Sequence, residues 1–259
     1  MSTSQKIPVA KNIYIRSHLK KNTMRISISL CLLIIIFMAG GVTARPIDIK
    51  TPNLEFSRGG KPRDPVMVPP DVTNNLALGC LVTASAKPLT QDPAKHAVPL
   101  GELSCVTDGL KEHDDHRLSL PAGKQWVQLD LGKTQEVWAV HIWYWYEYPC
   151  VYHDVVVQLS NDPSLTNNVI TVFNNDHDNT LGLGSGIHKE YIVTNEGRGI
   201  PVNGVQARYL RVYSNESTES FNNRYTEIEV YGCPPTDRPS AETTNRVPLK
   251  IMLPKPIFM

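Results

Sequence analysis

Arg-Tyr-Leu-Arg-Val-Tyr, at residues 208–213, is the stretch of this 259-residue chain that decides the fold most clearly. Leu210 and Val212 alternate there with arginine and tyrosine, and this period of two is typical of a strand with one buried face. Asp-Val-Val-Val-Gln-Leu-Ser, at residues 154–160, adds β-branched side chains, which fit a pleated and half-buried surface. Both stretches therefore predict strands of a sheet.

Similar short apolar runs, separated by Gly, Pro, Asn and Asp, continue from residue 71 to residue 233. No window has a convincing helical period, so parallel βαβ units are not expected. The sequence predicts an all-β, antiparallel sandwich or barrel. The expected strands are residues 81–85, 125–131, 136–146, 154–160, 169–173, 190–194, 208–213 and 227–231.

The N-terminal region has the pattern of an export signal. Met24-Arg25 forms a basic start, residues 26–38 are apolar, and Val42-Thr43-Ala44 supplies small residues. The apolar run is shorter than the roughly 20 residues of a membrane span. We expect residues 1–44 to be a signal region cleaved after Ala44, with Met24 as a possible true start and an uncleaved anchor as the alternative. The protein is then secreted, periplasmic or on the cell surface.

Segments rich in proline lie on both sides of the expected strands. Residues 45–70 and residues 234–259 have many prolines and no apolar period. This composition is typical of linkers and disordered tails. The sequence predicts a linker at 45–70, a folded domain at 71–233 and a disordered tail at 234–259.

Export would bring Cys80, Cys105, Cys150 and Cys233 into an oxidising compartment, where disulfides persist. Four cysteines permit three pairings. Because no two of them form a Cys-x-x-Cys pair, a zinc site is disfavoured. We favour Cys80–Cys105 with Cys150–Cys233, since each pair would tie strand ends together in a sandwich.

Charge is distributed unevenly along the chain. Residues 71–233 contain 11 Lys and Arg against 20 Asp and Glu, a net charge of 11 − 20 = −9. An acidic surface repels the phosphates of nucleic acids and the headgroups of anionic lipids. Nucleic acid and membrane are therefore disfavoured as partners, and calcium or a neutral ligand suits the domain better.

A series of short motifs runs through the expected domain. They are Asn-Leu-Ala-Leu-Gly at 75–79, Val-Thr-Ala-Ser at 82–85, Val-Thr-Asp-Gly at 106–109, Trp-Val-Gln-Leu-Asp-Leu-Gly at 126–132, Ala-Arg-Tyr-Leu-Arg-Val at 207–212 and Glu-Ile-Glu-Val-Tyr-Gly at 227–232. Their order resembles the discoidin or coagulation-factor-5/8 type C family, whose bacterial members include carbohydrate-binding modules. The resemblance covers essentially all of residues 71–233.

This resemblance implies an eight-stranded jelly-roll sandwich of the galactose-binding-like kind, with binding loops at one end. It also implies a structural calcium ion where the Asp-Gly loop meets the last strand. Asp108 and Glu227 would contribute side-chain oxygens, and Cys105 and Thr226 backbone carbonyls, a ligand set that suits calcium. After Gly109 this chain departs from the family pattern, because Leu-Lys-Glu-His stands where relatives have Asn and a nearby Thr.

Aromatic and polar side chains gather next to the expected loops. Residues 141–148 place rings on both faces of a strand, of which core packing explains at least half. Residues 173–180 are dense in hydrogen-bonding groups, but the EF-hand spacing fails, since Leu181 and Ile187 occupy its sixth and twelfth positions. The expected ligand-binding residues are Trp145, Tyr148, His153, His116, Arg117, Asn174, Asp176 and His177.

No motif of a hydrolase, a metalloprotease or a phosphate-binding loop is found in the sequence. We therefore predict that the protein is not an enzyme. The first hypothesis is a binding module that recognises carbohydrate. The alternative is a protein–protein adhesion or scaffold module that grips a surface protein with the same loops, and a third hypothesis is an enzyme with an unrecognised site at residues 176–179.

Overall fold

The computed structural model describes residues 51, 53–91, 100–112, 117–235 and 246–254. The expected export signal lies outside these residues, as does His116. None of the described helical residues forms a helix with the length and apolar character that a membrane span requires.

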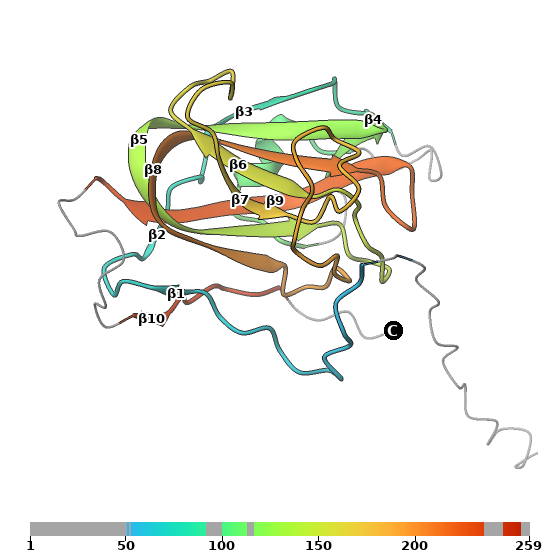
Figure 1. Cartoon of the computed structure of the whole chain (residues 1–259), viewed down its shortest axis with the longest axis horizontal. Helices are drawn as coiled ribbons and strands as arrows, with labels where there is room; N and C mark the ends of the chain where they lie inside the picture. The colour runs from blue at the N-terminus through green and yellow to red at the C-terminus, as the bar shows by residue number, and fades with distance from the viewer. Residues whose placement is uncertain (1–50, 52, 92–99, 113–116, 236–245, 255–259) are drawn as a thin grey trace, which may run out of the picture. The chain divides into compact units, whose positions relative to one another are not determined.

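The described residues form short and long strands and one 3-10 helix (Figure 1). All pairs of named strands are antiparallel. The predicted all-β, antiparallel fold is thereby confirmed. The elements are β1 (Met67–Val68), β2 (Asn74–Asn75), β3 (Leu81–Ala84), η1 (Leu103–Thr107), β4 (Leu118–Ala122), β5 (Lys124–Tyr144), β6 (Val156–Ser160), β7 (Ile170–Asn174), β8 (Arg198–Asn215), β9 (Asn222–Cys233) and β10 (Val247–Pro248).

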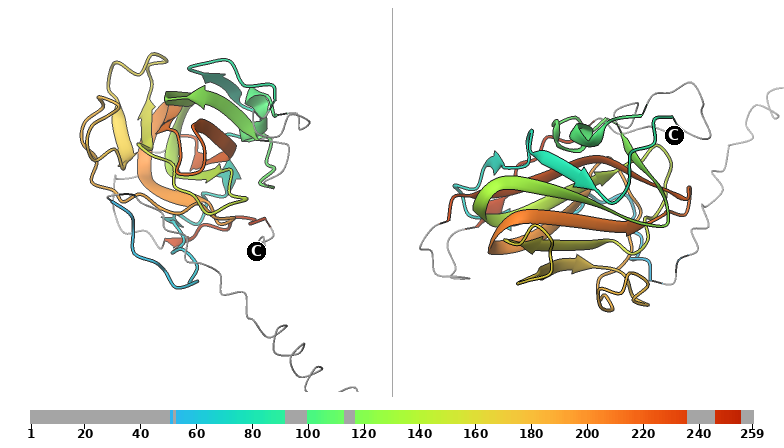
Figure 2. Two further views of the ribbon diagram at one scale, coloured as in Figure 1. Left: turned by 90° about the vertical axis from the view of Figure 1, so that its right-hand side faces the viewer. Right: turned by 90° about the horizontal axis from the view of Figure 1, so that it is seen from above.

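Two long strands, β5 and β8, run through both layers of the sandwich. The two strands pair along two stretches: one includes the pair Trp126 and Tyr213, and the other ends with the pair Ile142 and Arg198. The register shifts between Asp130 and Gln135, where Gly132 has a φ of +79°, a conformation that glycine adopts more easily than other residues. The paired strands bend there and fold back, as Figures 1 and 2 show. The strands predicted at 125–131 and 136–146 are the two halves of β5.

The order of strands in the sheet is β2-β9-β5-β8-β6-β7, with β3 paired to β5 and β4 paired to β9. The strand predicted at 190–194 is wrong, because Glu190 and Ile192 form only isolated bridges. Between the layers, alternating side chains make the main core, including the completely buried Leu129, Leu210 and Ile228. Each such side chain contributes about 1.5–3 kcal/mol through its burial.

The described parts of the expected linker and tail, residues 53–70 and 246–254, are folded against the sandwich, where the sequence predicted a linker and a disordered tail. β1 pairs with β10, and the Leu249 amide donates a hydrogen bond to the Val66 carbonyl over 2.9 Å. These terminal segments, residues 53–72 and 246–254, cover a second apolar cluster. It contains Val66, Val68, Val72, Trp138, Ala139, Tyr231, Cys233 and Leu249. Proline is compatible with such a structure, because edge strands tolerate it.

No disulfide joins Cys80, Cys105, Cys150 or Cys233 within the described residues, which differs from the predicted pairing. Cys80 instead donates a hydrogen bond to the Leu76 carbonyl. Cys150 lies close enough to Arg224, near the start of β9, for that charge to affect its pKa, whereas Cys233 ends the same strand. Strand residues rise by about 3.3 Å each, so Arg224 and Cys233 lie about 30 Å apart along β9, with Cys150 at the Arg224 end. A disulfide requires Cα atoms within about 7 Å, so the pairing Cys150–Cys233 is wrong.

Candidate functional site

Several loops meet at the end of the sandwich that lies opposite the bend of β5 and β8 (Figure 1). Backbone hydrogen bonds join the loop after β5 to β9 and to the loop after β8: the Trp145 amide donates to the Arg224 carbonyl, and the His153 amide to the Glu216 carbonyl. The ammonium of Lys124 donates to the Thr180 carbonyl in the loop after β7. We call this set of loops the loop end.

Trp145 is the anchor of the loop that follows β5. The guanidinium carbons of Arg117 and Arg224 lie 4.9 and 4.6 Å from its ring centroid, and Arg224 also pairs with Glu219 at 2.8 Å. Tyr148 meets the indole edge to face, with centroids 5.8 Å apart. Cation–π contacts of this kind contribute about 0.5–2 kcal/mol each, so the indole is held from several sides.

Exposure separates the two aromatic residues that were predicted to contact a ligand. Trp145 is only 2% exposed, so the structure corrects its role: the ring positions the loop instead of lying open. Tyr148 is 45% exposed and is therefore, of these two residues, the one that a ligand can reach. Arg117, also a predicted contact, is buried under the same loop.

His153 faces a buried carboxylate. Its Nδ1 lies 2.7 Å from Glu190 Oε1, and this hydrogen bond raises the pKa of the imidazole. Glu190 is held in place by a β-bridge with Leu54. The second carboxylate oxygen of Glu190 has no hydrogen-bond partner among the residues that the structure describes. The pair can orient a ligand hydroxyl. It is also an arrangement in which the Glu190 carboxylate would orient His153 as a base.

Three carboxylates next to His153 lie close together. The oxygens of Asp154, Asp176 and Asp178 fall within 4.8 Å of one another, close enough to share a metal ion. Burial raises the pKa of Asp154, and the charges of Asp176 and Asp178 raise it further. The predicted contact Asn174 supports this loop by donating to the Gly184 carbonyl, and His177 is exposed beside it.

The corner predicted to hold calcium is assembled from η1, the turn after it and β9. Gly109, with a φ of +86°, donates its amide to Glu227 Oε1 over 3.1 Å. Burial raises the pKa of Cys105, and the charges of Asp108 and Glu227 raise it further, so these three residues are neighbours. Thr226 precedes Glu227 on β9. The structure therefore brings together residues that lie more than a hundred positions apart.

Glu227 is completely buried, and its Oε2 finds no hydrogen-bond partner in the described part of the chain. Burial, with smaller effects from Glu229 and Asp108, raises the pKa of Glu227 to about 8. An uncompensated buried carboxylate is costly unless it is protonated or binds a cation. The described donors therefore fit a calcium ion, which prefers carboxylate and carbonyl oxygens.

Sequence reasoning missed the residues that complete these clusters. Arg224, Glu190 and Asp154 come from strand ends and loops far from the motifs that they join. Only the density of acidic residues at 176–178 signalled the acidic cluster. No pattern in the sequence could show that Asp154 lies beside it.

No family model matches the chain. No curated protein matches it either. Among solved structures, it is similar to the chitosan-binding module 1 of a chitosanase/glucanase from Paenibacillus sp. IK-5, with 24% identity, a TM-score of 0.42 and coverage of 61% of this chain and 99% of that chain. It is also similar to the Streptococcus pneumoniae fucose-binding module SpX-3, with 16% identity, a TM-score of 0.41 and coverage of 61% and 97%. A family 89 glycoside hydrolase from Clostridium perfringens shows 16% identity, a TM-score of 0.44 and coverage of 66% and 16%.

Proposed function

We propose that this chain is an exported, non-catalytic carbohydrate-binding protein whose ligand packs against Tyr148 at the loop end. The observation that carries the proposal is the exposed Tyr148 ring, held edge to face by Trp145, which is itself fixed by Arg117 and Arg224. Sugars offer apolar C–H faces to aromatic rings, and their hydroxyls need hydrogen-bonding groups. Binding sites commonly combine a fixed aromatic surface with a few polar groups.

Polar groups of the kind that hydroxyls need are present in the neighbouring loops. His153 with Glu190, and the carboxylates of Asp154 and Asp178, offer both donors and acceptors. The net charge of −9 over residues 71–233 favours a neutral ligand over an anionic polymer. Export rests on the signal pattern of residues 1–44.

Tyr148→Ala is expected to weaken polysaccharide binding about ten-fold, since an aromatic contact and its buried area are worth roughly 1–1.5 kcal/mol. Affinity gel electrophoresis over a polysaccharide panel, with calcium present, measures the effect. Leu81→Ala is the matched control, because Leu81 is 69% exposed and pairs with Asp130 beside the bend of β5, away from the loop end, and this variant should bind like the natural chain.

Two results would contradict this function. The first is a natural chain that no polysaccharide in the panel retards, and the second is equal retention of Tyr148→Ala. A protein partner that stays bound in excess sugar would instead favour adhesion to a surface protein. Hydrolysis of any panel member that is lost in His153→Ala would show catalysis at the His153–Glu190 pair.

We also infer that the Asp108–Glu227 corner binds calcium. The unpartnered, buried Oε2 of Glu227 and the neighbouring Asp108 support this assignment. Cys105 and Thr226 would add backbone carbonyls. The ion would neutralise the buried charge and fix the turn at Gly109 against β9, so its role is stability and not contact with the sugar.

A further inference from the structure

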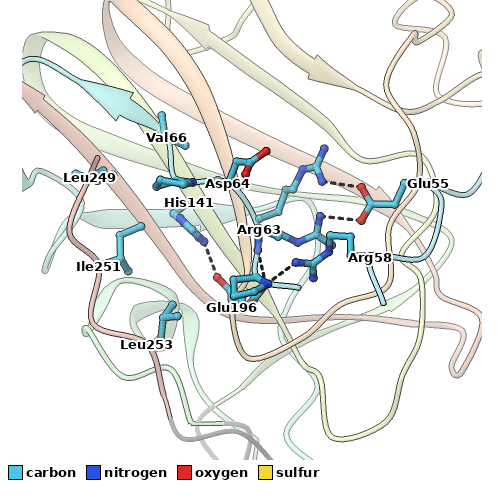
Figure 3. A pocket seen from close by; sticks show the side chains of 14 residues that line it. Glu55, Arg58, Arg63, Asp64, Val66, His141, Glu196, Leu249, Ile251 and Leu253 are labelled. Atoms are coloured by element: carbon cyan, nitrogen blue, oxygen red, sulfur yellow. Dashed lines mark hydrogen bonds and ion pairs between the residues drawn. The ribbon is translucent and has the colours of Figure 1, made fainter. Parts of the chain in front are cut away.

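A separate cavity of about 420 Å³ lies outside the loop end, between the terminal segments and the outer face of β5 and β8. Figure 3 shows its two unlike sides, with His141 between them. Val66, Leu249, Ile251 and Leu253 form an aliphatic side, while Glu55, Arg58 and Arg63 form a charged side. Its size falls in the range of small-molecule sites, which is about 300–1,000 Å³.

We propose that this cavity binds a medium-chain aliphatic carboxylate. The carboxylate would pair with Arg198 and its neighbouring guanidinium groups, and the hydrocarbon chain would lie along Leu249, Ile251 and Leu253. This site is independent of the carbohydrate site, because no residue of the Tyr148 or His153 clusters lines the cavity.

The charged side has more guanidinium groups than partly buried carboxylates. Arg58 pairs with Glu196 at 3.0 Å, while Arg63 and Arg198 share Glu55 at 2.7 and 3.0 Å. Three guanidinium groups therefore face two carboxylates. Asp64 also lines the cavity, but it is exposed, so water screens its charge.

Arg198 is the best-placed group for an incoming carboxylate. Among the described residues only its Nη1 has a hydrogen-bond partner, which leaves Nη2 and Nε available to form a two-pronged contact. The rings of Tyr191 and Phe173 lie 4.9 and 5.6 Å from its guanidinium carbon and hold the group in place. Burial lowers the pKa of Arg63, and the charges of Arg198 and Arg58 lower it further, so a bound anion would relieve their repulsion.

The opposite side favours an aliphatic body. Apart from His141, no lining residue is aromatic, and the described wall consists of valine, leucine, isoleucine and proline side chains. His141 adds no charge near neutral pH, because burial lowers its pKa to about 4. Its Nε2 donates to the Glu196 carbonyl over 2.8 Å. Gly199 lets Val66 pack closely against β8 in this wall, since a Cβ there would meet Val66 Cγ2 at 2.7 Å.

Isothermal titration of the full chain with hexanoate, octanoate and decanoate, below their micelle concentrations, tests the proposal. Each added methylene should tighten binding by roughly two- to four-fold, in line with up to about 0.8 kcal/mol per buried CH₂. 1-Octanol should bind at least ten-fold more weakly than octanoate. Arg198→Gln should remove that difference, and Leu253→Asn should reduce the gain per methylene.

Two controls separate this cavity from other surfaces. Arg208→Gln removes an arginine on the other half of β8, where it pairs with Asp130 of β5. Tyr148→Ala alters the loop end. Neither variant should change the affinity for octanoate. Circular dichroism checks that each variant folds. If Arg198→Gln does not fold, Leu253→Asn tests the proposal instead, because Leu253 is half exposed and its substitution should not unfold the chain. Absence of decanoate binding, or binding that both cavity variants leave unchanged, would overturn the proposal.

Discussion

In a chelator at pH 8, Glu227→Gln is expected to be more stable than the natural chain by about 2 kcal/mol, and millimolar calcium is expected to reverse that order. Without metal, the natural chain must hold a buried carboxylate whose Oε2 has no partner within the described structure. Glutamine removes the charge, keeps an oxygen for the Gly109 amide and can donate its NH₂ to the neighbouring Asp108. With calcium, glutamine loses an anionic ligand, so its advantage disappears.

The same group determines how the metal-free protein responds to pH. Folding raises the pKa of Glu227 from its ordinary 4.5 to about 8. Between these values the folded state binds more protons than the unfolded state, so the free energy of unfolding should fall as pH rises from 5 to 8. Each pH unit is worth at most about 1.4 kcal/mol, and water entering the corner reduces this. We expect a total loss of about 2 kcal/mol, which calcium should abolish.

Urea unfolding at pH 5, 6, 7 and 8, with chelator and with calcium, gives these free energies directly. Glu102→Gln is the matched control, because Glu102 is an exposed carboxylate just before η1, and it should follow the natural chain under every condition. If the natural chain unfolds in the same way with calcium and with chelator, the proposal that this corner binds calcium is wrong. If Glu227→Gln is more stable than the natural chain both in chelator and in calcium, Glu227 is a buried charge that binds no metal.

Strand positions could be predicted where one face of a strand meets water. Leu210 and Val212 alternate with half-exposed residues, and this contrast is written directly in the sequence. Residues 190–194 have similar composition, yet they form only bridges, because their partners are the single residues Leu54 and Val151. Alternation describes a strand's own faces and says nothing of whether a neighbouring strand is available to pair with it.

The candidate sites were only partly predictable for the same reason. Tyr148 and the Asp108–Glu227 corner were identified by an aromatic run and by a family resemblance. The burial of Trp145 depends on Arg117 and Arg224, which come from two other segments, so the aromatic run could not reveal it. Likewise, the position of Cys150 near Arg224, at the far end of β9 from Cys233, depends on the path of a loop that no local pattern describes.

Proline content misled the prediction for residues 53–70 and 246–254. Proline argues against central strands, and residues 45–70 and 246–254 are rich in it. The outer face of β5 and β9 nevertheless presents Trp138, Ala139 and Tyr231, which need an apolar cover. The terminal segments supply that cover with Val66, Val68 and Leu249. The requirement comes from the sandwich, so it could not be seen in the segments themselves.

Leu249→Ala is therefore expected to lower the free energy of unfolding by about 2–3 kcal/mol, in the range for truncating a buried leucine. Leu249 is 9% exposed and packs in the cluster of Trp138 and Tyr231, and its amide is bonded to Val66. Met252, three residues further on, is 85% exposed, so Met252→Ala should change stability by no more than about 0.5 kcal/mol. Urea unfolding of both variants at one pH, in calcium, measures the difference. If the C-terminal segment were a disordered tail, the two variants would unfold alike; a gap of about 2 kcal/mol between them requires that the segment be part of the folded domain.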